Sequence, residues 1–332
     1  MIFIKNDNTN PAINHAVEEY VLDKFDDDCF MLWRNEPSIL VGKNQNTLSE
    51  INLDYVREKN IPVIRRMSGG GTIFCDFGII QFTFISCNRA NKFADFGKFT
   101  SPVINALKKL EIEAELSGRN DLTIEGRKFS GNAQYSNKNK TLHHGSILFS
   151  PNMNNLVQAL KVKPIKFEGK AVKSVASRVT NISEHLKTAM TVIEFKNFLL
   201  DSVMSEYENS NLYEFSDEEW EKIRKISSEK YETWEWNYGH SPKFNYFNEK
   251  KFLGGIVQAN TYVYKGIIKD IKLFGDFFSE GEVKELEECL TGIKYVKEDI
   301  YKVLDNIDIE RYMSNISKEN LLSLIMGSDV VL

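Results

Sequence analysis

The sequence has few cysteines and no long apolar run. Its four cysteines, Cys29, Cys75, Cys87 and Cys289, are scattered among 332 residues without a C-x-x-C pair, which argues against a disulfide framework and a zinc ribbon. No stretch of 18 uncharged apolar residues occurs, and the N-terminus lacks the basic-then-apolar order of a signal peptide. These absences predict a soluble, cytoplasmic protein with no membrane partner.

Positive charge is not in excess either. Lysine and arginine total 42 against 47 aspartates and glutamates, a net charge of −5, so no global positive field is available to hold nucleic acid. With 42% apolar and 27% charged residues, the composition is that of an ordinary globular protein, and the length suits about two domains. We therefore expect a folded protein that does not bind nucleic acid, in which any anion site is local.

Short β-rich runs separated by single helices predict an α+β fold. Asn10 and Pro11 have the pattern of a helix N-cap and first helical residue, after a short strand at residues 3–4. Strands are expected within residues 29–86, at 120–124, at 128–130 and at 142–149, with helices near 53–59 and 99–110. An aromatic segment at 234–246 indicates a boundary, after which a strand in 251–257, a hairpin across 265–266 and helices near 280–290, 308–313 and 318–326 are expected.

Two arginines and three glycines stand together in RRMSGGGT, residues 65–72, between two β-rich runs. Successive glycines let a backbone approach a ligand, and their N–H groups can bind an anion beside the two guanidinium groups. The segment fits neither the P-loop nor the dinucleotide-binding pattern, and it leads into a strand rather than a helix. A phosphate site and a plain glycine hairpin with solvated arginines are equally open at this point.

A second polar segment, GRNDLTIEGRKFSGNAQ, covers residues 118–134. Strict alternation along its strand would turn Lys128, Ser130 and Asn132 to one face, where an ammonium group would suit phosphate chemistry. The alternative is an exposed, charged hairpin turn at residues 125–128, and these residues alone favour it.

Two further segments carry polar side chains. His143 and His144 are adjacent in an apolar strand, so they point to opposite faces, cannot both bind one metal ion in simple geometry, and are each expected to be structural. The segment VKSVASRVTNI, residues 172–182, either contacts a partner or closes over a ligand, or is a polar connector. Taken alone, it favours the connector.

These four segments, in this order, resemble the lipoate-protein ligase family. The matching signatures are RRMSGGGTIF, GRNDLTIEGRKFSGNAQ, LHHGSILF and SVASRVTNI, with WNYGHSPKF at the domain junction and AINHAVEEY and SILVGKNQNT also similar. The resemblance implies an α+β catalytic domain of the biotin/lipoate ligase type, related to class II aminoacyl-tRNA synthetase folds. It would span residues 1–244, with a small α+β accessory domain at 245–332.

The resemblance also implies an activity and its partners. Lipoate and MgATP would give lipoyl-AMP and pyrophosphate, and the lipoyl group would then pass to a lysine of lipoyl domains. The expected acceptors are the E2 subunits of 2-oxoacid dehydrogenases and the glycine cleavage H protein. Whether lipoate or octanoate is preferred is not implied.

Site residues follow from the same resemblance. Lys128 matches the family's central catalytic lysine, which contacts both ATP and lipoate. The other residues expected to bind ATP are Arg66, Gly71, Thr72, Ile73 and Phe74. The other residues expected to bind lipoate are Ser68, Gly70 and His144. Asn120 and Asp121 match a pocket pair, and Asp121 is assigned to Mg²⁺ or to the incoming amine.

One position departs from the family pattern. Phe74-Cys75-Asp76 stands where family members commonly carry a histidine after the glycine run. Cys75 is either a small residue without a chemical role or the nucleophile of an ATP-independent lipoyl or octanoyl transferase. A non-catalytic paralogue that binds lipoyl domains is a third hypothesis. The intact nucleotide set favours the ATP-dependent ligase.

Overall fold

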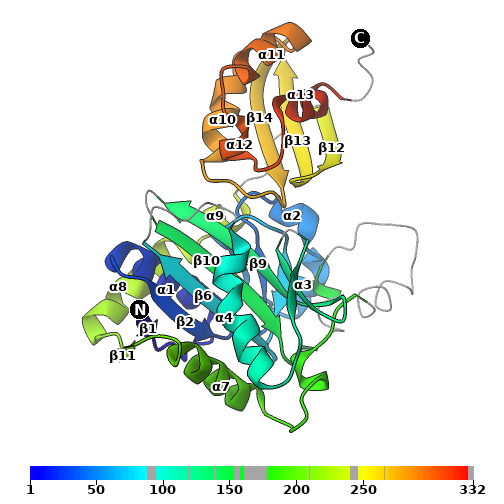
Figure 1. The fold of residues 1–332 in the computed structure, drawn as a ribbon. Coiled ribbons are helices and arrows are strands. Elements are labelled where there is room, and N and C mark those ends of the chain that lie inside the picture. The colour runs from blue at the N-terminus through cyan, green and yellow to red at the C-terminus, as the bar shows by residue number, and fades with distance from the viewer. Residues whose placement is uncertain are drawn as a thin grey trace. The chain divides into compact units, whose positions relative to one another are not determined.

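The computed structural model describes residues 1–87, 95–118, 120–137, 140–152, 158–160, 178–208, 210–239, 246–264 and 266–327. The chain forms two compact units (Figure 1). The larger comprises Met1–Leu40, Glu50–Arg65 and Ile73–Asn237, and the smaller comprises Val41–Ser49, Arg66–Thr72 and Tyr238–Leu332. The smaller unit thus includes most of the glycine segment. The boundary expected at 244/245 lies outside the described residues, as do Arg119 and residues 172–177.

An eight-stranded sheet organises the larger unit, in the order β11-β1-β2-β6-β10-β9-β8-β7. β1 pairs in parallel with β2 and β11, and the other described pairs are antiparallel, which is the mixed arrangement expected of an α+β fold. The strands are β1 (Ile2–Ile4), β2 (Cys29–Trp33), β6 (Ile79–Ser86), β7 (Glu115–Ser117), β8 (Asp121–Ile124), β9 (Arg127–Asn137), β10 (Lys140–Leu148) and β11 (Asn211–Tyr213). The sequence analysis did not predict β7 or β11.

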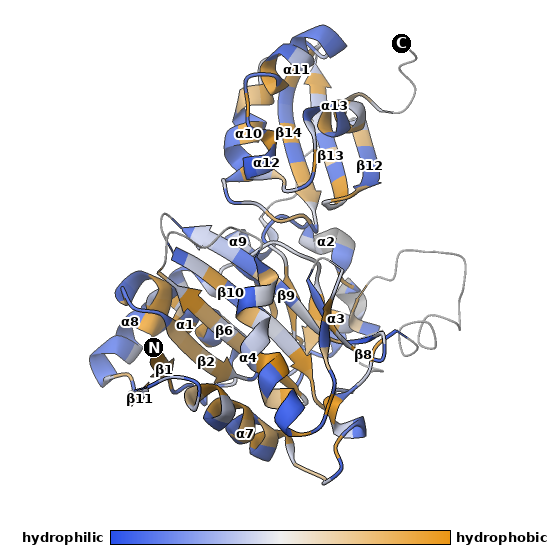
Figure 2. Ribbon diagram, viewed as in Figure 1, coloured by the Kyte–Doolittle hydropathy of each residue, from blue (hydrophilic) through white to orange (hydrophobic). Residues whose placement is uncertain are grey.

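Helices cover both faces of this sheet. On one face, α4 (Phe96–Lys109) and α7 (Val192–Met204) supply apolar side chains to a core that includes Phe82, Phe84, Phe99, Val103, Phe195 and Leu199. On the other face lies α1 (Pro11–Lys24), against which α8 (Asp217–Ile226) and the π-helical η2 (Ser227–Tyr231) pack. Figure 2 shows hydrophobic residues along β2 and β6 and a largely hydrophilic α8.

Local sequence explains the start of α1. The Asn10 side chain accepts hydrogen bonds from Ala12 N and Ile13 N at 2.9 and 3.1 Å, and Pro11 occupies the first helical position, as predicted. The helix predicted at 99–110 is α4, which begins three residues earlier, after the N-cap Asp95.

The larger unit also contains a three-stranded sheet, in the order β4-β3-β5. It is formed by β3 (Ser38–Val41), β4 (Val63–Arg65) and β5 (Ile73–Cys75), and α2 (Thr47–Glu50) and α3 (Leu53–Glu58) lie between β3 and β4 in the chain. Because β3 lies between β4 and β5, the segment that joins those two strands is a crossover. The plain glycine hairpin considered for residues 65–72 is therefore wrong.

The smaller unit contains an antiparallel sheet with helices packed on it. Its strands are β12 (Tyr246–Phe252), β13 (Gly255–Tyr264) and β14 (Ile267–Gly275), and its helices are α10 (Val283–Leu290), α11 (Lys297–Leu304), α12 (Ile309–Tyr312) and α13 (Lys318–Met326). The helices predicted near 280–290, 308–313 and 318–326 are confirmed, whereas α11 was not predicted.

The strand predicted across 251–257 is wrong, because the chain reverses at Leu253 and Gly254 between β12 and β13. Gly254 lies against the backbone of Ser314, where a side-chain carbon would stand 2.1 Å from the carbonyl oxygen. The run KFLGGIV therefore forms the ends of two strands and the two-residue turn that joins them. Among the residues that the structure describes, we find no helix with the length and apolar character needed to span a membrane.

Candidate active site

The glycine segment folds around the guanidinium group of Arg66. Arg66 Nη2 donates hydrogen bonds to the carbonyl oxygens of Gly69 and Gly71 at 2.8 and 2.7 Å, and Nε donates to Ser68 Oγ at 3.1 Å. Only 5% of Arg66 is exposed. The arginine therefore fixes the conformation of the segment, in addition to supplying positive charge.

Two of the three successive glycines are required, for different reasons. A side-chain carbon at Gly69 would lie 2.4 Å from the carbonyl oxygen of Phe277, and Gly70 has a φ of 90°, which disfavours other residues. Gly71 has neither constraint, since its φ is not positive and no described atom lies within 4 Å of where its Cβ would be. The space beside Gly71 is open to a ligand.

Arg65 serves a different purpose from its neighbour. Its Nε donates to Trp236 O at 3.0 Å, its backbone N–H donates to Asn237 Oδ1 at 2.8 Å, and Trp236 Nε1 donates to Arg65 O at 2.7 Å. Burial lowers the pKa of Arg65 to about 10. The sequence analysis placed both guanidinium groups beside the glycines, but Arg65 instead joins β4 to α9 (Trp234–Tyr238).

Lys128 lies on the face of the large sheet that α1 covers, because of a β-bulge. Thr123 pairs with Lys128 and Leu122 pairs with Ser130, so Phe129 is an extra residue in β9. Paired residues of adjacent strands share a face, and Leu122 belongs to the apolar core. Ser130 therefore lies on the core face and Lys128 on the opposite face. The prediction that Lys128, Ser130 and Asn132 share one face is wrong.

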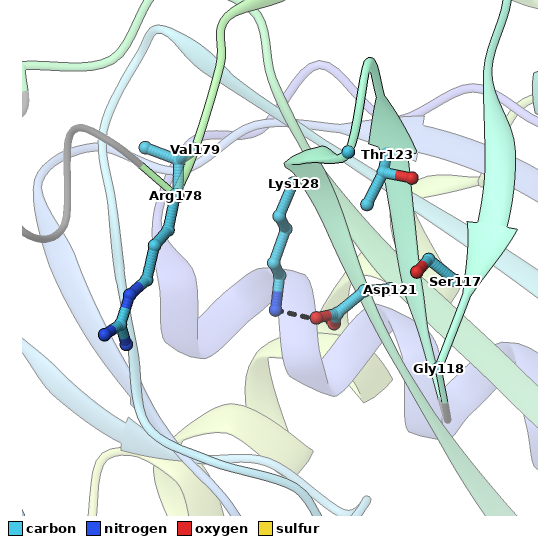
Figure 3. A pocket seen from close by; sticks show the side chains of 8 residues that line it. Ser117, Gly118, Asp121, Thr123, Lys128, Arg178 and Val179 are labelled. Carbon is cyan, nitrogen blue, oxygen red and sulfur yellow. Dashed lines mark ion pairs between the residues drawn. The ribbon is translucent and has the colours of Figure 1, made fainter.

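A cavity of about 460 Å³ opens beside Lys128. Lys128 Nζ lies 2.7 Å from Asp121 Oδ1. Figure 3 shows the lysine side chain directed toward this carboxylate, with Arg178 on the opposite side of the lysine. The lining residues are Ser117, Gly118, Asp121, Thr123, Gly126, Lys128, Arg178 and Val179. Two cations and one carboxylate thus face a space large enough for part of an anionic substrate.

The segment 178–180 holds the backbone of Lys128. Lys128 N donates to Arg178 O and Thr180 N donates to Lys128 O, both at 2.9 Å, so Val179 forms a parallel bridge with Lys128. The sequence analysis favoured a polar connector for this segment, which is wrong for residues 178–180. The run of basic and hydroxyl-bearing residues was the signal for Arg178, but nothing in the sequence indicated its pairing with Lys128.

Asn120 and Asp121 are adjacent but have different contacts. Asn120 Nδ2 donates to the carbonyl oxygen of Asn132 at 2.6 Å and thereby extends the pairing of β8 with β9, whereas Asp121 faces Lys128. Asn132 Oδ1 lies 3.2 Å from His143 Nε2 within the core. Asn120 is therefore placed to support the strands, and Asp121 to contact a ligand.

His143 and His144 point to opposite faces, as predicted. His143 stacks on Phe99 in the core, with ring centroids 5.0 Å apart, and burial together with the charge of His144 keeps the pKa of His143 well below its usual range. His144 Nδ1 lies 2.8 Å from Glu18 Oε1 on the α1 face. Neither histidine belongs to a cluster that could hold a metal ion among the described residues.

A buried carboxylate, Glu18, connects several polar groups on the α1 face. Its oxygens lie 2.8 Å from His15 Nδ1 and His144 Nδ1, and it accepts a hydrogen bond from the Thr83 hydroxyl at 2.7 Å. Burial acts to raise the pKa of Glu18, but the charges and hydrogen bonds of His144 and His15 outweigh it and lower this pKa. The sequence analysis missed Glu18; its spacing of three residues from His15 on one helix was the available signal.

Cys75 lies in β5 and is fully buried. Gln81 Nε2 donates a hydrogen bond to its Sγ at 3.2 Å. Ile73 and Phe74 are the first two residues of this strand, and Thr72 directly precedes it. The Thr72 hydroxyl donates to Gln45 Oε1 at 2.7 Å. The environment of Cys75 is that of a packed structural thiol.

Comparisons with known proteins agree with this description. The family model of the lipoyl protein ligase A/B catalytic domain matches residues 10–204, and that of the bacterial lipoate protein ligase C-terminus matches residues 241–325. The lipoate-protein ligase LplJ of Bacillus subtilis (strain 168) is 46% identical over 330 residues, which is 98% of this chain and 100% of that protein.

Two solved structures are also similar. The crystal structure of P. falciparum LipL1 in complex with lipoate is 28% identical and covers 98% of both chains, with a TM-score of 0.80. A bipartite lipoate protein ligase of Thermoplasma acidophilum, studied with its E2 lipoyl domain, is 26% identical and covers 73% of this chain and 97% of that one, with a TM-score of 0.65. By both family models and a relative that matches along its full length, the chain belongs to the lipoate-protein ligase family.

Proposed function

We propose that this ligase activates lipoate with ATP, which gives lipoyl-AMP and pyrophosphate. It then transfers the lipoyl group to a lysine of a lipoyl-domain protein. Membership of the family establishes the ligase activity, which activates lipoate and attaches it to protein. The observation that carries the residue-level proposal is the position of Lys128, whose amine lies at a 460 Å³ cavity beside Asp121.

Lys128 is the central group of the proposed mechanism. In the first step the lipoate carboxylate attacks the α-phosphorus of ATP, and negative charge builds up on the phosphoryl oxygens while pyrophosphate leaves. A positioned ammonium group stabilises that charge. In the second step the same group polarises the carbonyl of the mixed anhydride, which the acceptor amine attacks with release of AMP. Arg178, on the other side of the cavity, adds a second positive charge.

The glycine segment is proposed to bind the nucleotide. The open space beside Gly71 and the charge of Arg66 support this assignment, which extends to Thr72, Ile73 and Phe74. Lys128 is proposed to contact the same nucleotide. Ser68, Gly70 and His144 are proposed to bind lipoate, and for His144 the support is its place on the α1 face of the sheet, which also carries Lys128.

Mg²⁺ is proposed to accompany ATP. Proteins bind this ion through one or two carboxylates plus substrate phosphates, and Asp121, which lines the cavity, fits that requirement. Bound there, the ion would neutralise phosphate charge. Orientation of the incoming amine is the other role proposed for Asp121.

The acceptors are proposed to be E2 subunits and the glycine cleavage H protein. The archaeal ligase studied with its E2 lipoyl domain supports the first of these. A cytoplasmic location is also proposed, and the four free thiols support a reducing compartment.

The test is the intact mass of an apo lipoyl domain after incubation with the protein and lipoate, with and without MgATP. We expect a lipoyl mass increment only with MgATP, and octanoate in a parallel reaction reports the acyl preference. An increment without ATP would instead support an acyl transferase. No increment while lipoate still binds would support a non-catalytic binding protein.

A further inference from the structure

Gly131 lies beside the reactive end of Lys128. It is in β9, pairs with Asp121 of β8 and with Ser146 of β10, and follows the bulge at Phe129. Because of the bulge, Gly131 faces the same side of the sheet as Lys128, although the two residues are three positions apart. Gly131 therefore belongs to the wall on which the lysine side chain rests.

A side chain at position 131 would press against the lysine amine. A Cβ built on Gly131 would lie 3.0 Å from Lys128 Nζ, 3.2 Å from Lys128 Cε and 4.0 Å from Asp121 Oδ1. Carbon atoms in ordinary contact stand about 4 Å apart. Lys128 could keep its present position only if the added carbon were compressed against it.

The backbone gives no other reason for glycine at this position. Gly131 is not among the glycines with positive φ, unlike Gly118 and Gly126 in the same region, whose φ angles are 61° and 73°. The three nearest atoms to its missing Cβ belong to Lys128 and Asp121. Alanine can thus be accommodated by moving the flexible end of the lysine, without moving backbone.

We propose that Gly131 is a positioning residue for the reaction: the absence of its side chain keeps open the place where the Lys128 amine lies beside Asp121. This inference rests on the catalytic role proposed above for Lys128. The 3.0 Å contact requires the amine to move by a few tenths of an ångström. Because displacement of a reacting group by about 1 Å can reduce a rate on the order of 100-fold, this smaller shift should reduce the rate severalfold. Gly131 acts through Lys128 and touches no substrate in this account.

Gly131→Ala tests the proposal, with Gly97→Ala as the matched control. A Cβ at Gly97, in α4, would meet its nearest atoms at 3.9 Å, which is ordinary contact. We expect kcat for lipoate-dependent pyrophosphate release to fall by about 3- to 10-fold in Gly131→Ala, with KM values and the melting temperature close to those of wild type. Gly97→Ala should keep the wild-type kcat.

Two further measurements separate positioning from a general structural effect. In a Lys128→Ala background, adding Gly131→Ala should lower the residual rate no further, because the group it displaces is absent. A crystal structure of Gly131→Ala should show Lys128 Nζ moved away from Asp121. The proposal would be overturned if the amine of Lys128 did not move, or if it moved while kcat stayed at the wild-type value. It would also be overturned if Gly131→Ala lowered the rate in the Lys128→Ala background by the same factor as in wild type. If Lys128→Ala itself keeps full activity, the proposed role of Lys128 fails, and with it the role of Gly131, whatever the crystal structure shows.

Discussion

The two faces of the eight-stranded sheet hold polar side chains for different purposes. On the core face, His143, Asn132 and Gln134 are hydrogen-bonded to one another and enclosed by phenylalanine rings, and the pKa of His143 is lowered by burial. On the α1 face, His144 Nδ1 lies 2.8 Å from Glu18 Oε1, and Lys128 faces a cavity with Asp121. The polar residues of one face therefore serve packing, whereas those of the other face include residues that line the cavity.

The sharpest way to test this contrast uses two residues of β9. Lys128→Ala should lower lipoate-dependent pyrophosphate release by about 10²–10³-fold, because a preorganised charge is lost. Ser130→Ala, on the core face, should keep the wild-type rate and lower the free energy of unfolding by about 1 kcal/mol. Steady-state kinetics and urea unfolding distinguish the two. Equal rate losses in both variants would contradict the assignment of opposite roles.

The carboxylate of Glu18 should matter for stability on the α1 face. Glu18→Gln should lower the free energy of unfolding by about 3 kcal/mol, since it removes the buried negative charge between His15 and His144. Urea unfolding at neutral pH measures this. The control is Glu58→Gln, whose solvent-exposed pair with Lys59 should contribute little to stability. If both variants lowered the free energy of unfolding equally, the hydrogen bonds of Glu18 with His15 and His144 would not contribute the expected stability.

The core-face histidine predicts a pH dependence. The folded-state pKa of His143 is lowered, so its contribution to stability is fully present above the unfolded value of 6.5 and is lost as pH falls below it. Between pH 7.5 and 5.5 the free energy of unfolding should fall, with a slope from this residue approaching about 1.4 kcal/mol per pH unit.

His143→Phe keeps a ring beside Phe99 and removes the titrating group. Its unfolding free energy should therefore vary less with pH than that of wild type, as urea titrations across that range would reveal. Glu18 does not interfere, because its lowered pKa places its own loss below 4.5. An unchanged pH slope in the variant would mean that His143 is protonated in the folded state.

The smallest effect is expected at Cys75. Because its sulfur is buried and accepts a hydrogen bond from Gln81, Cys75→Ala should leave the rate of lipoylation within about twofold of wild type. The intact-mass assay on an apo lipoyl domain measures this. Complete loss of transfer by a folded Cys75→Ala protein would instead support Cys75 as the nucleophile of an ATP-independent transferase.

Local sequence was sufficient for much of the fold. The N-cap and proline of α1, the alternation that separates His143 from His144 and the short strands between residues 29 and 86 were all predicted, because each depends on neighbours within a few residues. The single strand expected in 251–257 is instead the ends of β12 and β13, because a two-residue turn at Leu253 and Gly254 interrupts it.

In the candidate site, too, some features could be predicted from the sequence and others could not. Motifs in the sequence identified Lys128, Asp121, Arg66 and the glycine run, since those residue types in that order carry the family resemblance. The sequence did not determine which face Lys128 occupies. Both backbone groups of Lys128 bond to residues 178–180, and the pairing with β8 shifts there, so the bulge depends on a segment about 50 residues away.

What the sequence determined by itself was therefore the family, the main elements and the residue types that carry the chemistry. Only the tertiary structure decided that Arg65 joins β4 to α9, that Glu18 is buried between two histidines, and that Gly131 leaves room for the lysine amine. The physical reason is that each of these depends on close approach between segments distant in the chain. Periodicity describes one element at a time, whereas register and close packing are set by several elements together.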